Sequence, residues 1–341
     1  MDAELLITNG RVIDGTGSLA FRADVAVCAD RIAFVGQTSD LSARRIIDAG
    51  GRVVCPGFID VHGHSDLVLL AEPRHAPKVM QGVTTEVIGQ DGLSYAPLTD
   101  RTTGQLRQAL KGLGGDPPGL TWNWRTVAEY LDRFDRKAAV NVAFLAPHGT
   151  IRAAAMGLEN RLPDQRELAE MKRLADRAMQ DGAAGLSTGL TYAPCSYADR
   201  RELVELCRVI GRHGGYFAPH MRCYGARMEQ AVEEVMKIAA QAKVPLHLTH
   251  FHVSFPTGRG KADHYLARID RARREGIEVT LDAYPYLAGS TFLAGLLPGW
   301  AHQGGPPELL RRLADRPTRD RLRREMEVTG SDGLSGVPAD W

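Results

Sequence analysis

The chain has 341 residues, of which 44% are hydrophobic and 24% are charged, and its formal net charge at pH 7 is +1. This balance is typical of a soluble globular protein with one large domain and a smaller one. The near-neutral charge and the lack of a basic tract argue against nucleic acid or a membrane surface as a partner. The five cysteines form no Cys-x-x-Cys pair and the acidic N-terminus shows no signal-peptide pattern, so we expect a cytoplasmic protein.

Residues 1–54 consist of short β-rich runs separated by turns. Asn9-Gly10 lies between two of these runs, and Asn-Gly is a strong signal for a two-residue hairpin turn. We therefore predict a hairpin at this pair and a small β-sandwich for the whole segment.

From Pro56 onward, apolar strand-like runs alternate with segments that have helical spacing. In residues 163–182, for example, Leu168, Met171 and Met179 recur at the intervals of one helix face. Repeated strand–helix units favour a parallel sheet covered by helices. The predicted strands are residues 57–61, 83–89, 139–149, 183–189, 215–220, 244–250 and 277–286.

Two folds compete for this pattern. A (β/α)8 barrel has eight strands and carries its active site at their carboxyl ends. An open, doubly wound sheet would carry a glycine-rich phosphate loop, and neither GxGxxG nor GxxxxGK[ST] opens a helix here. We therefore favour a TIM-like (β/α) barrel over residues 55–286, followed in residues 287–341 by an insertion that precedes an eighth strand not visible in the sequence.

Histidines gather at the predicted strand ends. Alternation along a strand directs residues i and i+2 to one face, so His62 and His64 both point into the barrel mouth. Imidazoles and carboxylates are the usual ligands of zinc and related ions, whereas burying several unpartnered imidazoles costs about 1–3 kcal/mol each. Together with His220 and His250 these residues predict a metal site.

Other histidines have simpler explanations. His148, taken singly, is expected to be a hydrogen-bonded core residue, and His75 is expected at the surface. Nucleophilic catalysis is the rival mechanism, but there is no GxSxG elbow and nothing nominates a base for Ser187. A divalent ion lowers the pKa of a bound water to about 7, so a metal-activated water is the better nucleophile.

Seven motifs in order carry a resemblance to a known family. They are "PGFIDVHGHSD", "QGVTTEVIGQDGLSYAP", "NVAFLAPHGTIR", "GLSTGLTYAP", "APHMR", "LTHFH" and "DAYPY". In this arrangement the chain resembles the N-acyl-D-amino-acid deacylases (D-aminoacylases) of the amidohydrolase superfamily. The resemblance implies a β-sandwich beside a metal-dependent barrel, and hydrolysis of the amide of N-acyl-D-amino acids with one or two zinc ions.

The resemblance also implies the metal ligands. His62 and His64 match the histidines of strand 1, while His220 and His250 match the ligands of strands 5 and 6. Relatives typically read "GNCG" at the end of strand 2 and use the Cys as a ligand, whereas this chain reads "GQDG" and places Asp91 there. A carboxylate is a harder ligand than a thiolate, so we expect a metal site with altered affinity or preference. The alternative is that Asp91 only caps a turn.

Three residues match positions that contact the substrate in the family. Tyr192 and Arg222 match residues that position it, and the guanidinium of Arg222 suits the substrate carboxylate because it can bind it bidentately. His252 stands where relatives usually carry a lysine that faces the same carboxylate. The implied substrate is therefore a small N-acyl amino acid.

The catalytic base is not assigned. In the family this base is an Asp on strand 8. The "GSDG" around Asp332 directly follows a helical segment, so we expect a loop there. Asp282, on strand 7, is expected to be structural.

A cyclic-amide, hydantoinase-like hydrolase is an alternative function, but residues 57–61, 83–89 and 139–149 contain no lysine to bridge two metals. The other alternative is a non-catalytic or incomplete subunit, with a second copy or a complementing C-terminal chain as its partner.

Overall fold

The computed structural model describes residues 2–37, 40–225, 227–253 and 258–326. It divides into two compact units, Met1–Phe58 and Ile59–Trp341. No helix among the described residues is long and apolar enough to cross a membrane.

The first unit contains one five-stranded sheet in the order β3-β2-β1-β4, with β5 also paired to β1. Its strands are β1 (Asp2–Val12), β2 (Phe21–Cys28), β3 (Arg31–Gly36), β4 (Ser42–Asp48) and β5 (Val53–Val54). β2 runs antiparallel to β1 and β3, whereas β4 and β5 run parallel to β1. The second layer of the predicted sandwich is not among the described residues of this unit.

The predicted hairpin turn at Asn9-Gly10 is wrong. Both residues lie inside β1, where the register to β2 shifts between Ile7 and Gly10 and Asn9 has a φ of 58°. The backbone N–H of Asn9 donates to Asp24 and its side-chain amide donates to Asp48, so neighbouring strands hold it in a bulge. Asn-Gly supplies the unusual backbone conformation, but the chain uses it to bend a strand.

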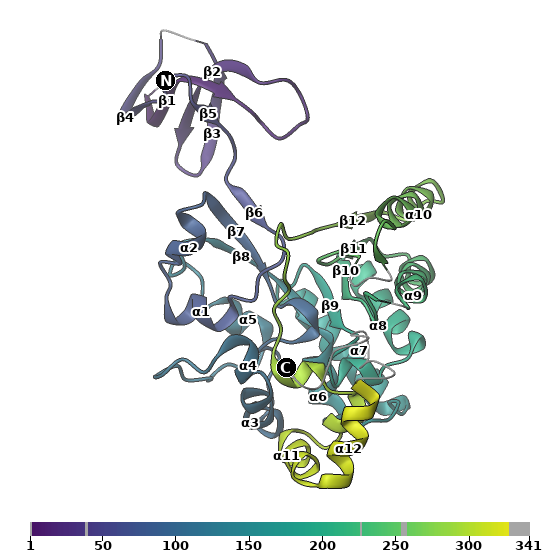
Figure 1. Cartoon of the computed structure of the whole chain (residues 1–341). Coiled ribbons are helices and arrows are strands. Elements are labelled where there is room, and N and C mark those ends of the chain that lie inside the picture. Colours follow the sequence, from purple (N-terminus) through teal and green to yellow (C-terminus); the bar gives the residue numbers. More distant parts are fainter. Residues whose placement is uncertain (1, 38–39, 226, 254–257, 327–341) are drawn as a thin grey trace. The chain divides into compact units, whose positions relative to one another are not determined.

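The second sheet has seven strands whose spatial order follows the chain order (Figure 1). They are β6 (Phe58–Asp60), β7 (Val83–Ile88), β8 (Asn141–Pro147), β9 (Gly185–Gly189), β10 (Tyr216–His220), β11 (Leu246–Leu248) and β12 (Val279–Leu281). Neighbours from β7 to β12 pair in parallel. All seven predicted strands are confirmed, and their carboxyl ends therefore meet on one side of the sheet.

Most of the helices connect the strands, and the last two follow β12. The helices are α1 (Asp66–Ala71), α2 (Ala76–Val79), α3 (Asp100–Ala109), α4 (Lys111–Gly114), α5 (Val127–Leu131), α6 (His148–Met156), α7 (Gln165–Gln180), α8 (Arg200–Arg212), α9 (Met228–Ala242), α10 (Ala262–Arg274), α11 (Pro306–Ala314) and α12 (Arg316–Arg324). The predicted helix in residues 163–182 is α7, which begins at a capping box between Asp164 and Glu167 and buries Met171 and Met179.

Strands and helices share one large core. Phe144, Leu186 and Phe217, from successive strands, are fully buried in it together with Ile210 of α8 and Val235 of α9. Close packing of this kind fixes the strand ends, and the loops that follow them, in one geometry.

Candidate metal centre

Four histidines and one aspartate converge at the carboxyl ends of the strands. His62 and His64 follow β6, His220 ends β10 and His250 follows β11. Asp91 lies in the short helix η1 (Gln90–Gly92) after β7. The structure thus brings together all five predicted ligands, which we call the metal centre.

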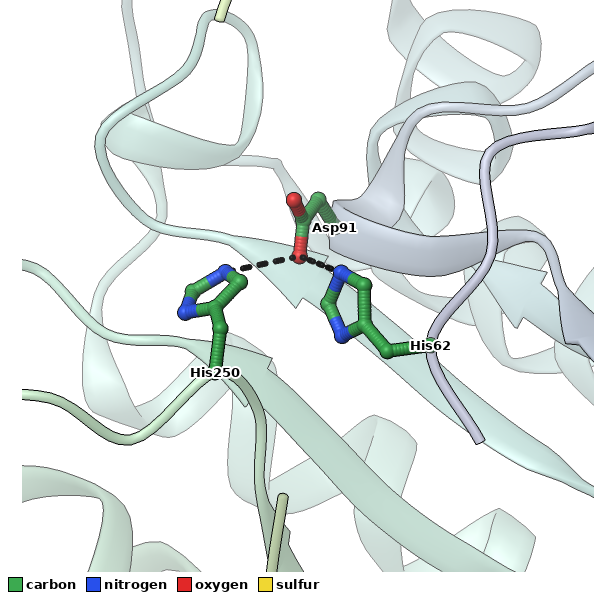
Figure 2. Close-up of side chains that lie close together, drawn as sticks. All are labelled: His62, Asp91 and His250. Carbon is green, nitrogen blue, oxygen red and sulfur yellow. Dashed lines mark ion pairs between the residues drawn. The ribbon is translucent and has the colours of Figure 1, made fainter. Parts of the chain in front are cut away.

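The Asp91 carboxylate lies at the middle of the metal centre. Its Oδ1 is 3.5 Å from Nε2 of His250 and 3.9 Å from Nε2 of His62. Its Oδ2 is 3.4 Å from Nε2 of His64 and 3.7 Å from Nδ1 of His220. Figure 2 shows the carboxylate between the His62 and His250 imidazoles, and ligand atoms of these three residues lie within 4.8 Å of one another.

These distances leave buried polar atoms without ordinary hydrogen bonds. Oδ1 of Asp91, Nδ1 of His62 and Nδ1 of His250 are buried and have no hydrogen-bond partner. An unsatisfied buried polar atom costs about 1–3 kcal/mol, and an ion between Oδ1 of Asp91 and the Nε2 atoms of His62 and His250 would offset this cost at Oδ1. Imidazole nitrogens around a carboxylate are the donor set that zinc takes in proteins, so the residues present fit a divalent ion.

The charge states of Asp91 and His220 also suit a cation. Burial raises the pKa of Asp91, but His250, His220 and His64 outweigh burial and hold the pKa well below its usual value. Burial lowers the pKa of His220 to about 4. The carboxylate is therefore ionised and the His220 imidazole neutral at pH 7, which is the form in which both groups bind metals.

Asp282, just after β12, lies against three histidines. Its Oδ1 accepts a hydrogen bond from the backbone N–H of His250 at 2.8 Å, and its Oδ2 lies 3.6 Å from Nδ1 of His62. Oδ2 also pairs with Nε2 of His247 at 2.9 Å. Asp282 thus holds the backbone of His250 and the ring of His247 in place, which agrees with the structural role predicted for it.

Two of the predicted substrate contacts border the metal centre. The ring centroid of Tyr192 lies 4.7 Å from that of His220, and its hydroxyl shares a 3.0 Å hydrogen bond with Thr291. His252 stacks on Tyr224 with their ring centroids 4.7 Å apart. Both side chains are thus placed beside the ligands.

Arg222 is engaged elsewhere in this structure. Its Nε donates to Glu234 at 3.1 Å, Nη1 donates to the carbonyl of Ser196 at 3.0 Å, and Nη2 donates to the carbonyl of Ala198 at 3.1 Å. The guanidinium therefore holds the loop after β9 against α9, and its contact with a substrate carboxylate stays a prediction. Asp332 lies outside the described residues.

Comparison with known proteins decides the family. A sequence model of the Amidohydrolase family matches residues 45–331. The chain belongs to the amidohydrolase family. D-aminoacylase of Alcaligenes xylosoxydans xylosoxydans is 40% identical over 291 residues, which cover 85% of this chain and 59% of that protein. N-acyl-D-glutamate deacylase of the same organism is 39% identical over 85% of this chain and 58% of its own length.

Solved structures of the same kinds of enzyme are similar to this chain in fold. A D-aminoacylase with a binuclear metal centre superposes with a TM-score of 0.77 at 40% identity, covering 84% of this chain and 59% of that one. N-acyl-D-glutamate deacylase of Bordetella bronchiseptica, solved with zinc and a phosphonate inhibitor, gives 0.78 at 38% identity, with coverages of 84% and 59%. A D-hydantoinase at 16% identity and a TM-score of 0.51 shares the fold alone. The predicted fold class and family are confirmed, and this amidohydrolase spans about three-fifths of the relatives it matches.

Position 63, between His62 and His64, requires glycine for a steric reason. A Cβ on Gly63 would overlap the carboxylate of Glu86, which is fully buried on β7. Glu86 cannot move away freely, because it accepts a hydrogen bond from Ser65 at 2.7 Å and pairs with Nε2 of His75 at 2.8 Å. The predicted surface position of His75 is therefore wrong, since this pairing buries it. In the sequence, the indication of this buried acid is that Glu86 is the only charged residue in the strand run "VTTEVIG".

Replacing Gly63 with alanine is expected to displace Glu86 and, with it, the backbone that carries His62 and His64. Overpacking of a buried site lowers the free energy of unfolding by about 1–3 kcal/mol. Urea denaturation and the zinc content of the purified variant measure both effects. Gly104→Ala is the matched control, because Gly104 is exposed on α3 with no atom near its missing Cβ, and alanine there is expected to stabilise the helix. A Gly63→Ala protein with unchanged stability and zinc content would contradict this steric account.

The loop that carries Asp91 is held by Ser187 of β9. Asp91 has a φ of 57°, between Gly89 at 79° and Gly92 at 67°. The Ser187 hydroxyl accepts a hydrogen bond from the N–H of Gly92 at 3.0 Å and donates one to the carbonyl of Gly89. It thereby bridges both ends of the left-handed turn. The sequence pointed to Ser187 only as a nucleophile without a base, whereas the structure makes it a positioning residue for Asp91.

Ser187→Ala is expected to weaken zinc binding about 10–100-fold, as loss of a group that orients a ligand typically does. Competition with a chelating dye measures the affinity. Ser196→Ala is the matched control, because its buried hydroxyl has no hydrogen-bond partner and does not touch the Asp91 loop. Equal affinities in the two variants would show that the Ser187 hydroxyl does not position Asp91.

His148 is a hydrogen-bonded core residue, as predicted. It begins α6, with Nδ1 2.8 Å from the Thr188 hydroxyl and Nε2 2.7 Å from the Glu202 carboxylate. The same Glu202 oxygen accepts a 3.1 Å hydrogen bond from Nε of Arg152. Burial lowers the pKa of His148, but Cys195 and Glu202 outweigh burial and raise it to about 9. In this amidohydrolase His148, Glu202 and Arg152 therefore form a buried hydrogen-bonded network.

Proposed function

We propose that this amidohydrolase hydrolyses the amide bond of N-acyl-D-amino acids with zinc at the metal centre. The single observation that carries the proposal is the convergence of four imidazoles on the Asp91 carboxylate, with buried atoms of three residues left unpaired. The similarity to D-aminoacylase and N-acyl-D-glutamate deacylase supports the substrate class.

The residues of the chain have distinct roles in this proposal. His62, His64, Asp91, His220 and His250 would hold one or two zinc ions. When bound, zinc supplies polarisation of the amide carbonyl and a water of lowered pKa. Asp282 would hold the backbone of His250 in place. In the described part of the chain the sheet ends at β12, so we assign the proton-transfer step to no residue.

Substrate recognition is proposed at the rim of the metal centre. The Tyr192 ring packs on the His220 imidazole. The Tyr224 ring lies between His220 and His252, and His252 stacks on it. His252 would donate a hydrogen bond to the carboxylate of the amino acid, and Arg222 would support the loop that bears Tyr192. The substrate is a small molecule, with no nucleic acid or membrane partner. We also propose a cytoplasmic location, consistent with five cysteines that form no disulfide.

Release of free amino acid from N-acetyl-D-leucine and N-acetyl-D-glutamate by the zinc-loaded protein tests the proposal. The L-enantiomers and hydantoin are the matched controls. We expect hydrolysis of the D-compounds alone, and its loss when the metal is removed by a chelator. Hydrolysis of hydantoin in preference to the acyl amino acids, or no hydrolysis of any amide, would contradict the proposed function.

A further inference from the structure

An apolar cavity of about 140 Å³ lies beside the metal centre. Three segments supply most of its lining: the end of α3 with Leu110, the loop Thr191–Pro194 after β9, and part of the segment 292–309. Leu93, Gly149 and Leu158 complete the lining, whose polar side chains include Gln108, Thr191 and His302. Among the described residues that line it there is no aspartate, glutamate, lysine or arginine.

The cavity shares a wall with the metal centre. The Thr191 hydroxyl is 2.8 Å from Nε2 of His220, and the Tyr192 ring packs on the same imidazole. Both residues also line the cavity. On its far side Tyr192 contacts Phe292, with ring centroids 5.2 Å apart, so the segment 292–309 closes the cavity over this tyrosine.

The size and chemistry of the cavity restrict its occupant. Sites for whole small molecules are typically about 300–1,000 Å³, so a cavity of about 140 Å³ holds one substituent of a ligand. A carboxylate without a partner is costly to bury in apolar surroundings. The mostly apolar lining therefore favours a hydrocarbon group as the occupant.

The connectivity of the substrate selects which hydrocarbon group. In an N-acyl amino acid the carboxylate and the amino-acid side chain share one carbon, on the nitrogen side of the amide. The acyl chain extends from the opposite side. The rings from Tyr192 through His220 and Tyr224 to His252 form a continuous series, with the cavity at the Tyr192 end and the proposed carboxylate contact at the other.

We propose that this cavity binds the hydrocarbon tail of the acyl group, so that the enzyme prefers N-acyl groups longer than acetyl. The inference rests on the proposed function, because it places the amide carbonyl at the metal centre and the carboxylate at His252. Burial of one methylene group contributes about 0.8 kcal/mol, which corresponds to about a fourfold rise in kcat/KM.

A series of acyl chains on one amino acid tests the preference. With D-leucine fixed, we expect kcat/KM to rise about fourfold per methylene from acetyl to butanoyl and to fall for decanoyl, which exceeds the cavity. Calorimetric binding of the same series to metal-depleted protein is expected to follow the same order without any turnover. A flat dependence on chain length would overturn the inference.

Variants that fill the cavity test whether the preference for longer acyl chains arises there. Ala109→Phe and Ala294→Leu enlarge side chains on two different lining segments and are expected to bring the butanoyl-to-acetyl ratio close to one. Gln105→Phe is the matched control, because it adds the same ring at an exposed position of α3 outside the cavity and keeps the wild-type ratio. An unchanged ratio in both filling variants would overturn the inference.

The two proposals fail in different ways. Loss of discrimination between D-alanine and D-norleucine derivatives in the filling variants, with the acyl ratio intact, would assign the cavity to the amino-acid side chain and overturn the inference alone. Chain-length-dependent binding that the filling variants abolish, in a protein that hydrolyses no amide, would support the cavity and contradict the proposed function.

Discussion

Asp91→Asn is expected to lower the zinc affinity of the protein by at least about 100-fold, with a parallel loss of hydrolysis. The Asp91 carboxylate is within 4 Å of all four imidazoles of the metal centre and supplies its only negative charge among the described ligands. Loss of groups that merely orient a ligand already costs 10–100-fold, so loss of the ligand itself costs at least as much. Zinc content after dialysis and competition with a chelating dye measure the change.

The same substitution separates the ligand role from the turn-capping alternative. Asparagine tolerates the left-handed backbone at position 91 and caps turns as aspartate does, so the turn is expected to survive. Asp91→Cys supplies a thiolate and is expected to restore zinc binding. Asp263→Asn, at an exposed position on α10, is the matched control. Wild-type zinc affinity in Asp91→Asn would mean that Asp91 serves only the turn.

Glu202→Gln is expected to lower the free energy of unfolding by about 3–5 kcal/mol. Glu202 is almost fully buried and accepts hydrogen bonds from His148 and Arg152, whose side chains are fully buried too. Removing the negative charge leaves the guanidinium of Arg152 in the core with carbonyl partners alone. Urea denaturation followed by circular dichroism measures the loss.

Glu233→Gln is the matched control for Glu202→Gln. Glu233 pairs with Lys237 at the surface of α9, where solvent screens the interaction. The denaturation midpoint of the Glu233→Gln protein is therefore expected to stay near that of the wild type. A Glu202→Gln protein as stable as this control would show that the buried network does not stabilise the fold.

The sequence predicted the barrel strands and the convergence of His62 and His64 because both depend on local periodicity. Parallel strands covered on both faces leave continuous apolar runs, and the two-residue repeat of a strand places His62 and His64 on one face. Asp91 was predicted by its place in the motif order, since "GQDG" follows the strand run directly.

The sequence did not predict features set by residues far apart in the chain. Ser187 reaches Gly92 and Gly89 across 95 and 98 residues, and no local pattern encodes that bridge. Likewise, His75 is buried because packing brings it to Glu86, and Asn9-Gly10 forms a bulge because Asp24 and Asp48 hold it. In each case a tertiary hydrogen bond overrides the local preference.

Anomalous scattering at the zinc edge, measured on crystals of the zinc-loaded protein, tests the central claim most directly. We expect a zinc peak about 2.0–2.2 Å from an imidazole nitrogen of His62 and of His250 and from a carboxylate oxygen of Asp91. The absence of a peak at these residues, with zinc bound elsewhere or not at all, would contradict the metal centre and the function proposed from it.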